Sequence, residues 1–190
     1  ERVLWKFAGF VWLPEAHHST SEHELQMLQT RSAAGDASPA LGTLHGFVAQ
    51  RWMDGTRLRR EAASPEVLEM IGRYVAHAAG ALLTGDQQDA ALVRLREMLY
   101  WNTWELLGEA EAAKTAQWTR IDAPMQHYGD GHLAPHEWVR AADGRIVKTD
   151  SVGHDYDHTM VGQQSILWDV AGAVIEWAGD EECAALIVNA

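Results

Sequence analysis

Residues 130–150 read DGHLAPHEWVRAADGRIVKTD. Two apolar runs within this stretch, Trp138-Val139-Arg140 and Ile146-Val147-Lys148, flank the dipeptide Asp143-Gly144. Asp-Gly between two such runs is a strong local signal for a β-hairpin, because both residues tolerate the backbone conformation of a tight turn. We therefore expect a hairpin here, with polar side chains crowded into the loops at both of its ends.

The polar residues at the ends of this hairpin suit phosphoryl transfer. That chemistry needs a base or positioning group near the acceptor hydroxyl, and oxygen ligands that hold Mg²⁺ on the phosphates. Asp130 and His132 are the candidate catalytic residues in the loop before the hairpin. Glu137 and Asp150 are oxygen donors on either side of it, and they are the candidate metal ligands.

The flanking segments predict an α+β protein. Strand patterns fall within residues 2–12 and 46–53, and between them a helix start at Ser19 or Ser21 leads to a helix that ends near Gly35. Helical periodicity then dominates the second half of the chain. The expected helices there begin at Pro65, run from about residue 86 to 115, begin at Ile166, and run over 181–188.

Composition and charge narrow the function further. The chain has 190 residues, of which 47% are hydrophobic, so it can bury a core. Its net charge of −12 argues against nucleic acid or an anionic membrane as partner and suits a small cationic or metal-chelated ligand.

No apolar run is long enough to span a bilayer, and the single Cys183 excludes an internal disulfide, so a cytoplasmic protein is expected. Most of the nine tryptophans are expected in the core.

Several of these motifs together resemble the aminoglycoside phosphotransferase and choline kinase families. The family loop reads His-Gly-Asp, two residues, Pro, any residue, Asn, then a hairpin and an Asp. When Pro135 is aligned with the family proline, Glu137 falls on the metal-binding Asn and Asp150 falls on the Asp that follows the hairpin. Residues 143–147 look like the family's Asp-Gly-Arg-Ile-Val. Residues 168–171 look like its Tyr-Asp-Leu-Ala, in which the Asp, here Asp169, is structural.

The resemblance implies a protein-kinase-like fold that binds ATP and Mg²⁺. Residues 1–55 would form a partial N-terminal lobe with a short antiparallel sheet, one helix and a hinge strand, and 56–190 a mainly helical C-terminal lobe. The hinge strand, with Gln50 and Trp52, would hold adenine through its backbone. Lys6 would bind phosphate, with Glu22 or Glu24 as its helix partner.

The sequence departs from the family at the catalytic loop. His132 stands where the family has its catalytic Asp, and Asp130 stands where the family has its His.

Two functions of the protein follow as hypotheses. The first is an ATP-dependent phosphotransferase that acts on a hydroxyl of a small, cationic molecule such as an aminoglycoside or amino alcohol. The alternative is a pseudokinase-like nucleotide-binding or regulatory domain without catalysis.

Two further features complete the sequence-based expectations. His154, Asp155, Asp157 and His158 form a cluster that can bind a transition metal, although solvation or acceptor recognition is the expected role in a loop this polar. The chain begins with a strand pattern and no methionine, so a missing upstream segment is expected. The family's glycine-rich phosphate cover does not occur in the given sequence. The sequence does not indicate an oligomeric state.

Overall fold

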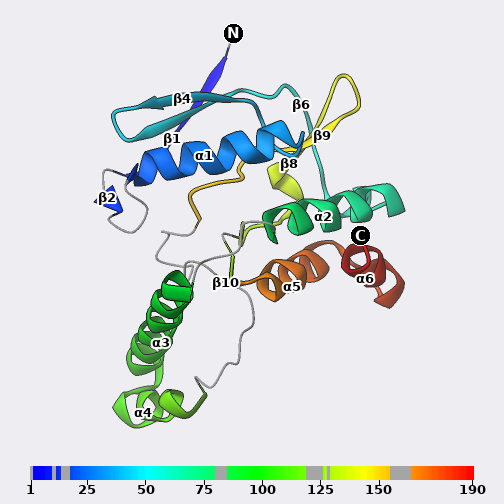
Figure 1. Cartoon of the computed structure of the whole chain (residues 1–190). Helices are drawn as coiled ribbons and strands as arrows, with labels where there is room; N and C mark the ends of the chain where they lie inside the picture. Colours follow the sequence, from blue (N-terminus) through cyan, green and yellow to red (C-terminus); the bar gives the residue numbers. More distant parts are fainter. Residues whose placement is uncertain are drawn as a thin grey trace.

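The computed structural model describes residues 2–9, 12–13, 18–79, 85–118, 126–127, 129–154 and 164–190. The fold is α+β, as the sequence predicts, with the two three-stranded antiparallel sheets and one helix at one end and the other helices towards the opposite end (Figure 1). Within the described helices, none has both the length and the apolar composition needed to cross a membrane.

The first sheet comes from the N-terminal part of the chain. Its strand order is β1-β5-β4, with every pair antiparallel, and its strands are β1 (Val3–Phe7), β4 (Ala40–Leu44) and β5 (Phe47–Arg51). Helix α1 (Thr20–Ala33) packs on this sheet and buries Leu28 against Val48. The predicted strands and helix are confirmed. Strand β4 was not predicted, and its pairing with β5 is irregular, with a register shift between Ala40 and Gly42.

The predicted hairpin is the centre of the second sheet. Strands β8 (Trp138–Ala141) and β9 (Ile146–Lys148) pair across the Asp-Gly turn, and β6 (Gly55–Arg57) pairs with the other side of β8. Gly55 allows this pairing because a Cβ atom there would overlap the carbonyl oxygen of Arg140. The turn dipeptide Asp54-Gly55 thus ends one sheet and begins the next.

A layer of three helices supports the second sheet (Figure 1). It consists of α2 (Pro65–Ala79), α5 (Ile166–Trp177) and α6 (Glu181–Val188), which pack on one another. Their shared core also includes Leu133 from the loop before the hairpin, whose carbonyl accepts a hydrogen bond from the Trp177 indole at 2.6 Å. This contact fixes the loop on the helical layer.

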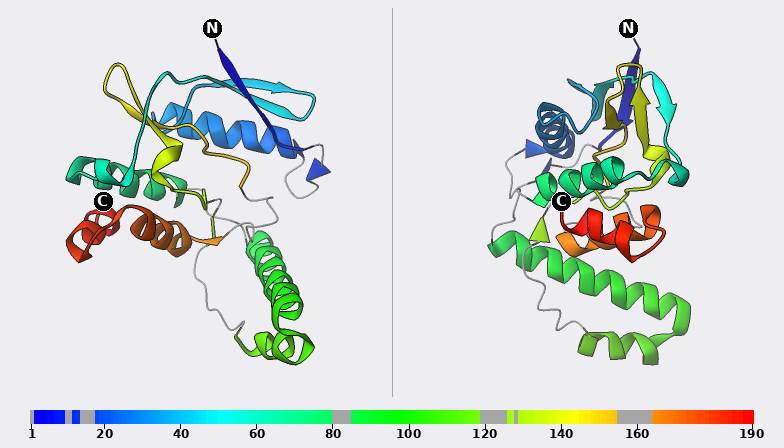
Figure 2. Two further views of the ribbon diagram at one scale, coloured as in Figure 1. Left: turned by 180° about the vertical axis from the view of Figure 1, so that it is seen from behind. Right: turned by 90° about the vertical axis from the view of Figure 1, so that its right-hand side faces the viewer.

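The sequence predicts a single long helix over residues 86–115, and this prediction is wrong in one respect, because the structure has two helices there. Helix α3 (Gly85–Leu107) ends at Gly108, and α4 (Glu109–Trp118) begins directly after it. Gly108 has a φ of +88°, a left-handed conformation that glycine adopts readily and that ends a helix. In both views of Figure 2 the α3–α4 pair lies to one side of the layer formed by α2, α5 and α6.

The remaining elements are short. Two-stranded pairs join β2 (Trp12–Leu13) to β3 (His18–Ser19) and β7 (Gln126–His127) to β10 (Gln164–Ser165). The 3₁₀ turns are η1 (Arg60–Ala62) and η2 (Pro135–Glu137). The two sheets are joined where the loop after α1 meets the end of β9: the Lys148 N–H donates to the Asp36 carbonyl at 2.9 Å, and Ala37 forms a bridge with Lys148.

The expectation that most tryptophans are buried is wrong for the described side chains. Trp138 and Trp177 lie in the core, where their rings meet edge to face. Exposed tryptophans outnumber them in the part of the chain that the structure describes, namely Trp5, Trp52, Trp101, Trp104 and Trp168. Burial of a large ring depends on which helix or sheet face it occupies, which composition does not encode.

Candidate functional site

A cleft of about 300 Å³ lies between the first sheet and the hairpin of the second. Its walls include residues from β1, from β5 and the segment after it, and from the end of the hairpin, among them Lys6, Gln50, Trp52, Met53, Thr149 and Asp150. Lys6 of β1 pairs in register with Val48 of β5, and Trp52 follows the end of β5, so both residues line the same cleft. Four of the predicted site residues therefore share one cavity.

Lys6 and Asp150 form an ion pair on the wall of this cleft. The Lys6 ammonium donates to Asp150 Oδ1 and to the Val152 carbonyl, and the Asp150 side chain keeps 45% of its surface exposed. Burial alone raises the pKa of Asp150, but the hydrogen bond with His154 and the charge of Lys6 hold it well below its usual range. Asp150 is therefore an accessible carboxylate that stays ionised near neutral pH.

Of the two candidate helix partners of Lys6, Glu24 faces the site and Glu22 is exposed. Burial raises the pKa of Glu24 to about 7, against the opposing charges of Lys6 and Arg31. Gly153, with a φ of +87°, packs between Lys6 and Glu24: a Cβ atom there would lie 3.1 Å from Lys6 Cε and 3.8 Å from Glu24 Oε2. The Lys6 ammonium thus interacts with two carboxyl groups, those of Asp150 and Glu24.

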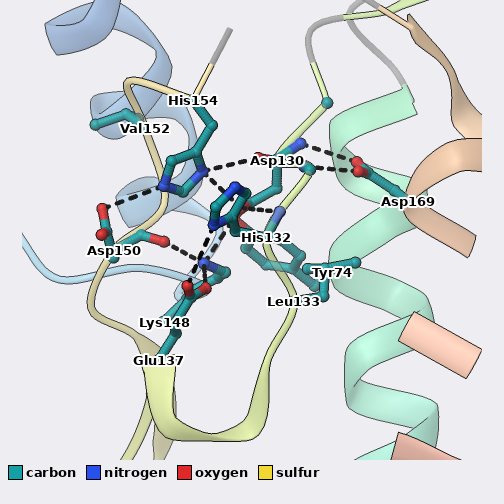
Figure 3. A network of polar contacts seen from close by, with 12 residues as sticks. Tyr74, Asp130, His132, Leu133, Glu137, Lys148, Asp150, Val152, His154 and Asp169 are labelled. Atoms are coloured by element: carbon teal, nitrogen blue, oxygen red, sulfur yellow. Dashed lines mark hydrogen bonds and ion pairs between the residues drawn. The ribbon is translucent and has the colours of Figure 1, made fainter. Parts of the chain in front are cut away.

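Asp130 is buried and surrounded by donors from four parts of the chain (Figure 3). The Tyr74 hydroxyl donates to Oδ2, and Arg31 Nη1 lies 3.6 Å from the same oxygen. On Oδ1, the contacts are Lys148 Nζ at 3.2 Å and His154 Nδ1 at 3.1 Å. Burial alone raises the pKa of Asp130, but Lys148, His154 and Arg31 hold it far below its usual range. This carboxylate is a permanent internal anion with 1% of its surface exposed.

Asp169 at the start of α5 holds the backbone of the same loop. Its Oδ2 accepts from the Asp130 N–H at 2.9 Å and its Oδ1 from the Gly131 N–H at 2.7 Å. Gly129 packs against this carboxylate so closely that a Cβ atom would lie 2.8 Å from Oδ2. The contact is structural in kind, which is the role that the resemblance implies for Asp169.

His132 differs from Asp130 in its accessibility. Its side chain is 40% exposed, and its Nδ1 lies 3.7 Å from Glu137 Oε1. Its ring stacks on His154 with the centroids 4.4 Å apart. Of the two candidate catalytic residues, only His132 has a side chain that is accessible to solvent.

His154 connects the loop of Asp130 to the Lys6–Asp150 pair. Its Nδ1 contacts the Asp130 carbonyl at 2.7 Å as well as the carboxylate, and its Nε2 lies 3.6 Å from Asp150 Oδ1. Burial lowers the pKa of His154, but the hydrogen bonds with Asp130 and Asp150 outweigh it and raise the pKa to about 9. The expectation that this histidine is solvated is wrong. Asp155, Asp157 and His158 lie outside the described residues.

Glu137 is held by a different cation from Asp150 (Figure 3). Lys148 Nζ donates to Glu137 Oε2 at 2.6 Å and to the backbone carbonyl of Asp150. The Asp150 carboxylate faces Lys6 and His154 instead, so Glu137 and Asp150 lie near each other without converging on Lys6. Among the described residues, no three His, Cys, Asp or Glu side chains are arranged to hold a metal ion.

Mg²⁺ bound to a nucleotide needs only one or two protein carboxylates, because the phosphates and water supply the other ligands. Asp150 fits that requirement, since it is accessible and ionised in the cleft. Glu137, with 11% of its side chain exposed and an ammonium on its oxygen, does not offer the same access.

Sequence reasoning missed four members of this cluster: Arg31, Tyr74, Lys148 and His154 in this role. Arg31 and Tyr74 occur in helices where their spacing marks only a core-facing position. The sequence did carry a signal for Lys148, because alternation along β9 places it on the same face as Ile146. In the structure this end of the strand is buried.

Comparison with known proteins does not assign this site. The chain matches no protein-family model, and no curated protein sequence matches it significantly.

Proposed function

We propose that this chain binds ATP in the cleft between its two sheets and transfers the terminal phosphoryl group to a hydroxyl of a small molecule. The observation that carries the proposal is the Lys6–Asp150 pair on the wall of a cleft that Trp52 and Met53 also line. A cation for phosphate, an accessible carboxylate for Mg²⁺ and an apolar region for a base in one cavity are the requirements of phosphoryl transfer.

Each part of the cleft has a role in this proposal. The segment with Gln50 and Trp52 holds the adenine, and Lys6, beside buried Glu24, binds phosphate oxygens. Asp150 is the residue that holds Mg²⁺, which neutralises phosphate charge when it is bound. The proposal includes a protein-kinase-like fold, with residues 1–55 as a partial N-terminal lobe and 56–190 as the C-terminal lobe, in a cytoplasmic protein.

His132 is the proposed base. Histidine is the commonest general base in enzymes, and a positioned base contributes about 10²–10⁴ to the rate. Asp130 supports the loop from within, since both of its oxygens contact internal donors. A small cationic acceptor suits the net charge of −12.

A second candidate function is nucleotide binding without catalysis, as in a regulatory domain. The observation that favours it is the internal pairing of the acidic groups: Glu137 and Asp130 both contact the buried Lys148 ammonium. In this alternative the cleft binds ATP, and the loop of His132 serves only to maintain the fold.

Two measurements on the 190-residue chain distinguish these functions. Thermal melts with ATP and Mg²⁺ test binding, because a ligand of the native state raises the midpoint. Labelled ATP with a panel of amino alcohols and aminoglycosides tests transfer. The phosphotransferase predicts that Asp150→Ala abolishes turnover, that His132→Gln lowers kcat by about 10²-fold or more, and that His136→Gln, a change of an exposed histidine in the same loop, has little effect.

The outcomes separate cleanly. A higher midpoint without turnover supports the binding domain, and turnover that Asp150→Ala leaves unchanged refutes the metal assignment. If ATP with Mg²⁺ does not shift the midpoint, both functions are wrong.

A further inference from the structure

The ammonium of Lys148 occupies a cage of oxygen atoms. Its three contacts come from three segments: Glu137 Oε2 at 2.6 Å, Asp130 Oδ1 at 3.2 Å, and the backbone carbonyl of Asp150. An ammonium group has three donors, so each has an oxygen within reach. Lys148 is 0% exposed, although lysine is among the residues least often buried.

The charges around Lys148 explain why it remains in the interior. A buried ammonium is costly unless opposite charges compensate it, and here two carboxylates do so. Arg31 and His154 contact the same Asp130 from its other sides, so the cluster contains similar numbers of positive and negative groups. Removal of the ammonium alone leaves Glu137 without the cation that it contacts and takes one of three cations away from Asp130.

Two carboxylates and a backbone carbonyl around a single point form a donor set that hard divalent cations also use. We propose that Lys148 is a built-in cation that fills this cage permanently, so that Glu137 is a counter-ion of Lys148 and does not bind a metal. The part of the proposal that concerns nucleotide rests on the proposed function: the cleft then takes one divalent ion, at Asp150, and not two.

The cage and the cleft are connected through Asp150. Its backbone carbonyl contacts Lys148, while its carboxylate lines the cleft with Lys6. Lys148 thus orients the segment that carries the exposed carboxylate without touching the cleft itself. This makes Lys148 a positioning residue, whose effect is seen in metal binding and stability as well as in turnover.

A metal-rescue experiment without nucleotide tests the cage directly. Lys148→Ala removes the ammonium and leaves space, whereas Lys148→Met removes the charge but fills the space with a side chain of similar length. Both variants and the wild type are melted with and without Mn²⁺, which accepts the same oxygen ligands as Mg²⁺. The double variant Glu137→Gln, Lys148→Ala is the control for the cage.

The expected result is that Mn²⁺ raises the midpoint of Lys148→Ala in a saturable way. At a concentration about ten times the Kd, the rise should be about 3–6 °C. Wild type and Lys148→Met should show no comparable rise, and the double variant should lose most of it. If Lys148→Ala is soluble only when it is refolded with Mn²⁺, the proposal is also supported.

The proposal is overturned if Mn²⁺ gives Lys148→Ala no more stabilisation than it gives the wild type. It is equally overturned if Glu137→Gln leaves the rescue intact, or if Lys148→Ala folds neither with Mn²⁺ nor without it. These outcomes are independent of ATP. A wild type that ATP does not stabilise refutes the proposed function and leaves the cage result standing, whereas two Mn²⁺ ions bound per chain with ATP refute the single-ion site alone.

Discussion

The carboxylate of Asp169, from helix α5, holds the backbone N–H of Asp130 at 2.9 Å while the Asp130 side chain points the other way, into a cluster of cations. Asp130 is thus fixed twice, through its main chain by Asp169 and through its side chain by donors from α1, α2, β9 and the segment after β9. The loop that carries His132 follows directly, so its position depends on both contacts.

Asp169→Ala should destabilise the protein by about 2–4 kcal/mol, because two N–H groups lose a charged acceptor in a buried position. Urea unfolding measures the change. Glu176→Gln, an exposed site on the same helix, is the control and should change the free energy of unfolding by less than about 0.5 kcal/mol. Equal effects of the two changes contradict the assigned role of Asp169.

Tyr74→Phe should cost about 1–3 kcal/mol, because it removes the hydroxyl donor to the buried Asp130 carboxylate and keeps the ring that packs against Trp138. The matched control is Tyr100→Phe on α3, whose ring meets Trp101. Chemical denaturation of both variants should show the loss only for Tyr74. A stability of Tyr74→Phe equal to that of the wild type means that the hydroxyl makes no net contribution.

Gly153→Ala and Gly144→Ala separate backbone strain from crowding. The two glycines have φ values of +87° and +86°, so alanine strains both by about 1 kcal/mol. At Gly144 the new Cβ meets no atom within 4 Å, whereas at Gly153 it presses on Lys6. Gly153→Ala should therefore be the less stable variant, and it should also weaken any ATP-dependent rise in the melting midpoint. Indistinguishable variants contradict the packing of Gly153 between Lys6 and Glu24.

The stability of the protein should fall between pH 7 and pH 9 because of His154. Its folded-state pKa of about 9 lies above the ordinary value of 6.5, so its contribution is complete below pH 6.5 and is lost as the pH rises through 9. The loss between pH 7 and 9 should be roughly 2 kcal/mol. Glu24, with a pKa of about 7, makes its change mainly below this window.

His154→Gln tests this pH dependence, because glutamine keeps a donor but does not titrate. The free energy of unfolding of the variant, measured by urea titration at each pH, should be nearly flat between pH 7 and 9. The pKa values of Asp130 and Asp150, which contact the ring, are held well below their usual range, so these carboxylates stay ionised across the window. A slope as steep as that of the wild type therefore assigns the effect to another group.

Much of the fold was predictable because it depends on local patterns. The hairpin at 138–148 follows from alternation on both sides of Asp-Gly, and α2, α5 and α6 follow from apolar spacing, with Pro65 at the start of α2. Strand β4 and the break at Gly108 were missed. A bulge and a single left-handed glycine change the path of the chain without changing the hydrophobic pattern.

The candidate site was predictable only in part. The sequence pointed to Lys6, Asp130, His132, Glu137 and Asp150 as residues of interest, and the structure brings these residues into one region. The sequence did not indicate their partners. Lys148 and His154 changed the interpretation most, since one occupies the oxygen cage of Glu137 and the other links Asp130 to Asp150.

The sequence by itself determined the α+β class, the hairpin and most helices, because hydrophobic periodicity and turn chemistry act over a few residues. The tertiary structure alone decided which acidic groups are accessible and which are neutralised. Asp130 and Asp150 are both aspartates in polar loops, yet one lies among four buried donors and the other faces a cleft. Whether a carboxylate is ionised and accessible depends on the charges near it and on its burial. Both are contributed by segments distant in sequence, which come together only when the chain folds.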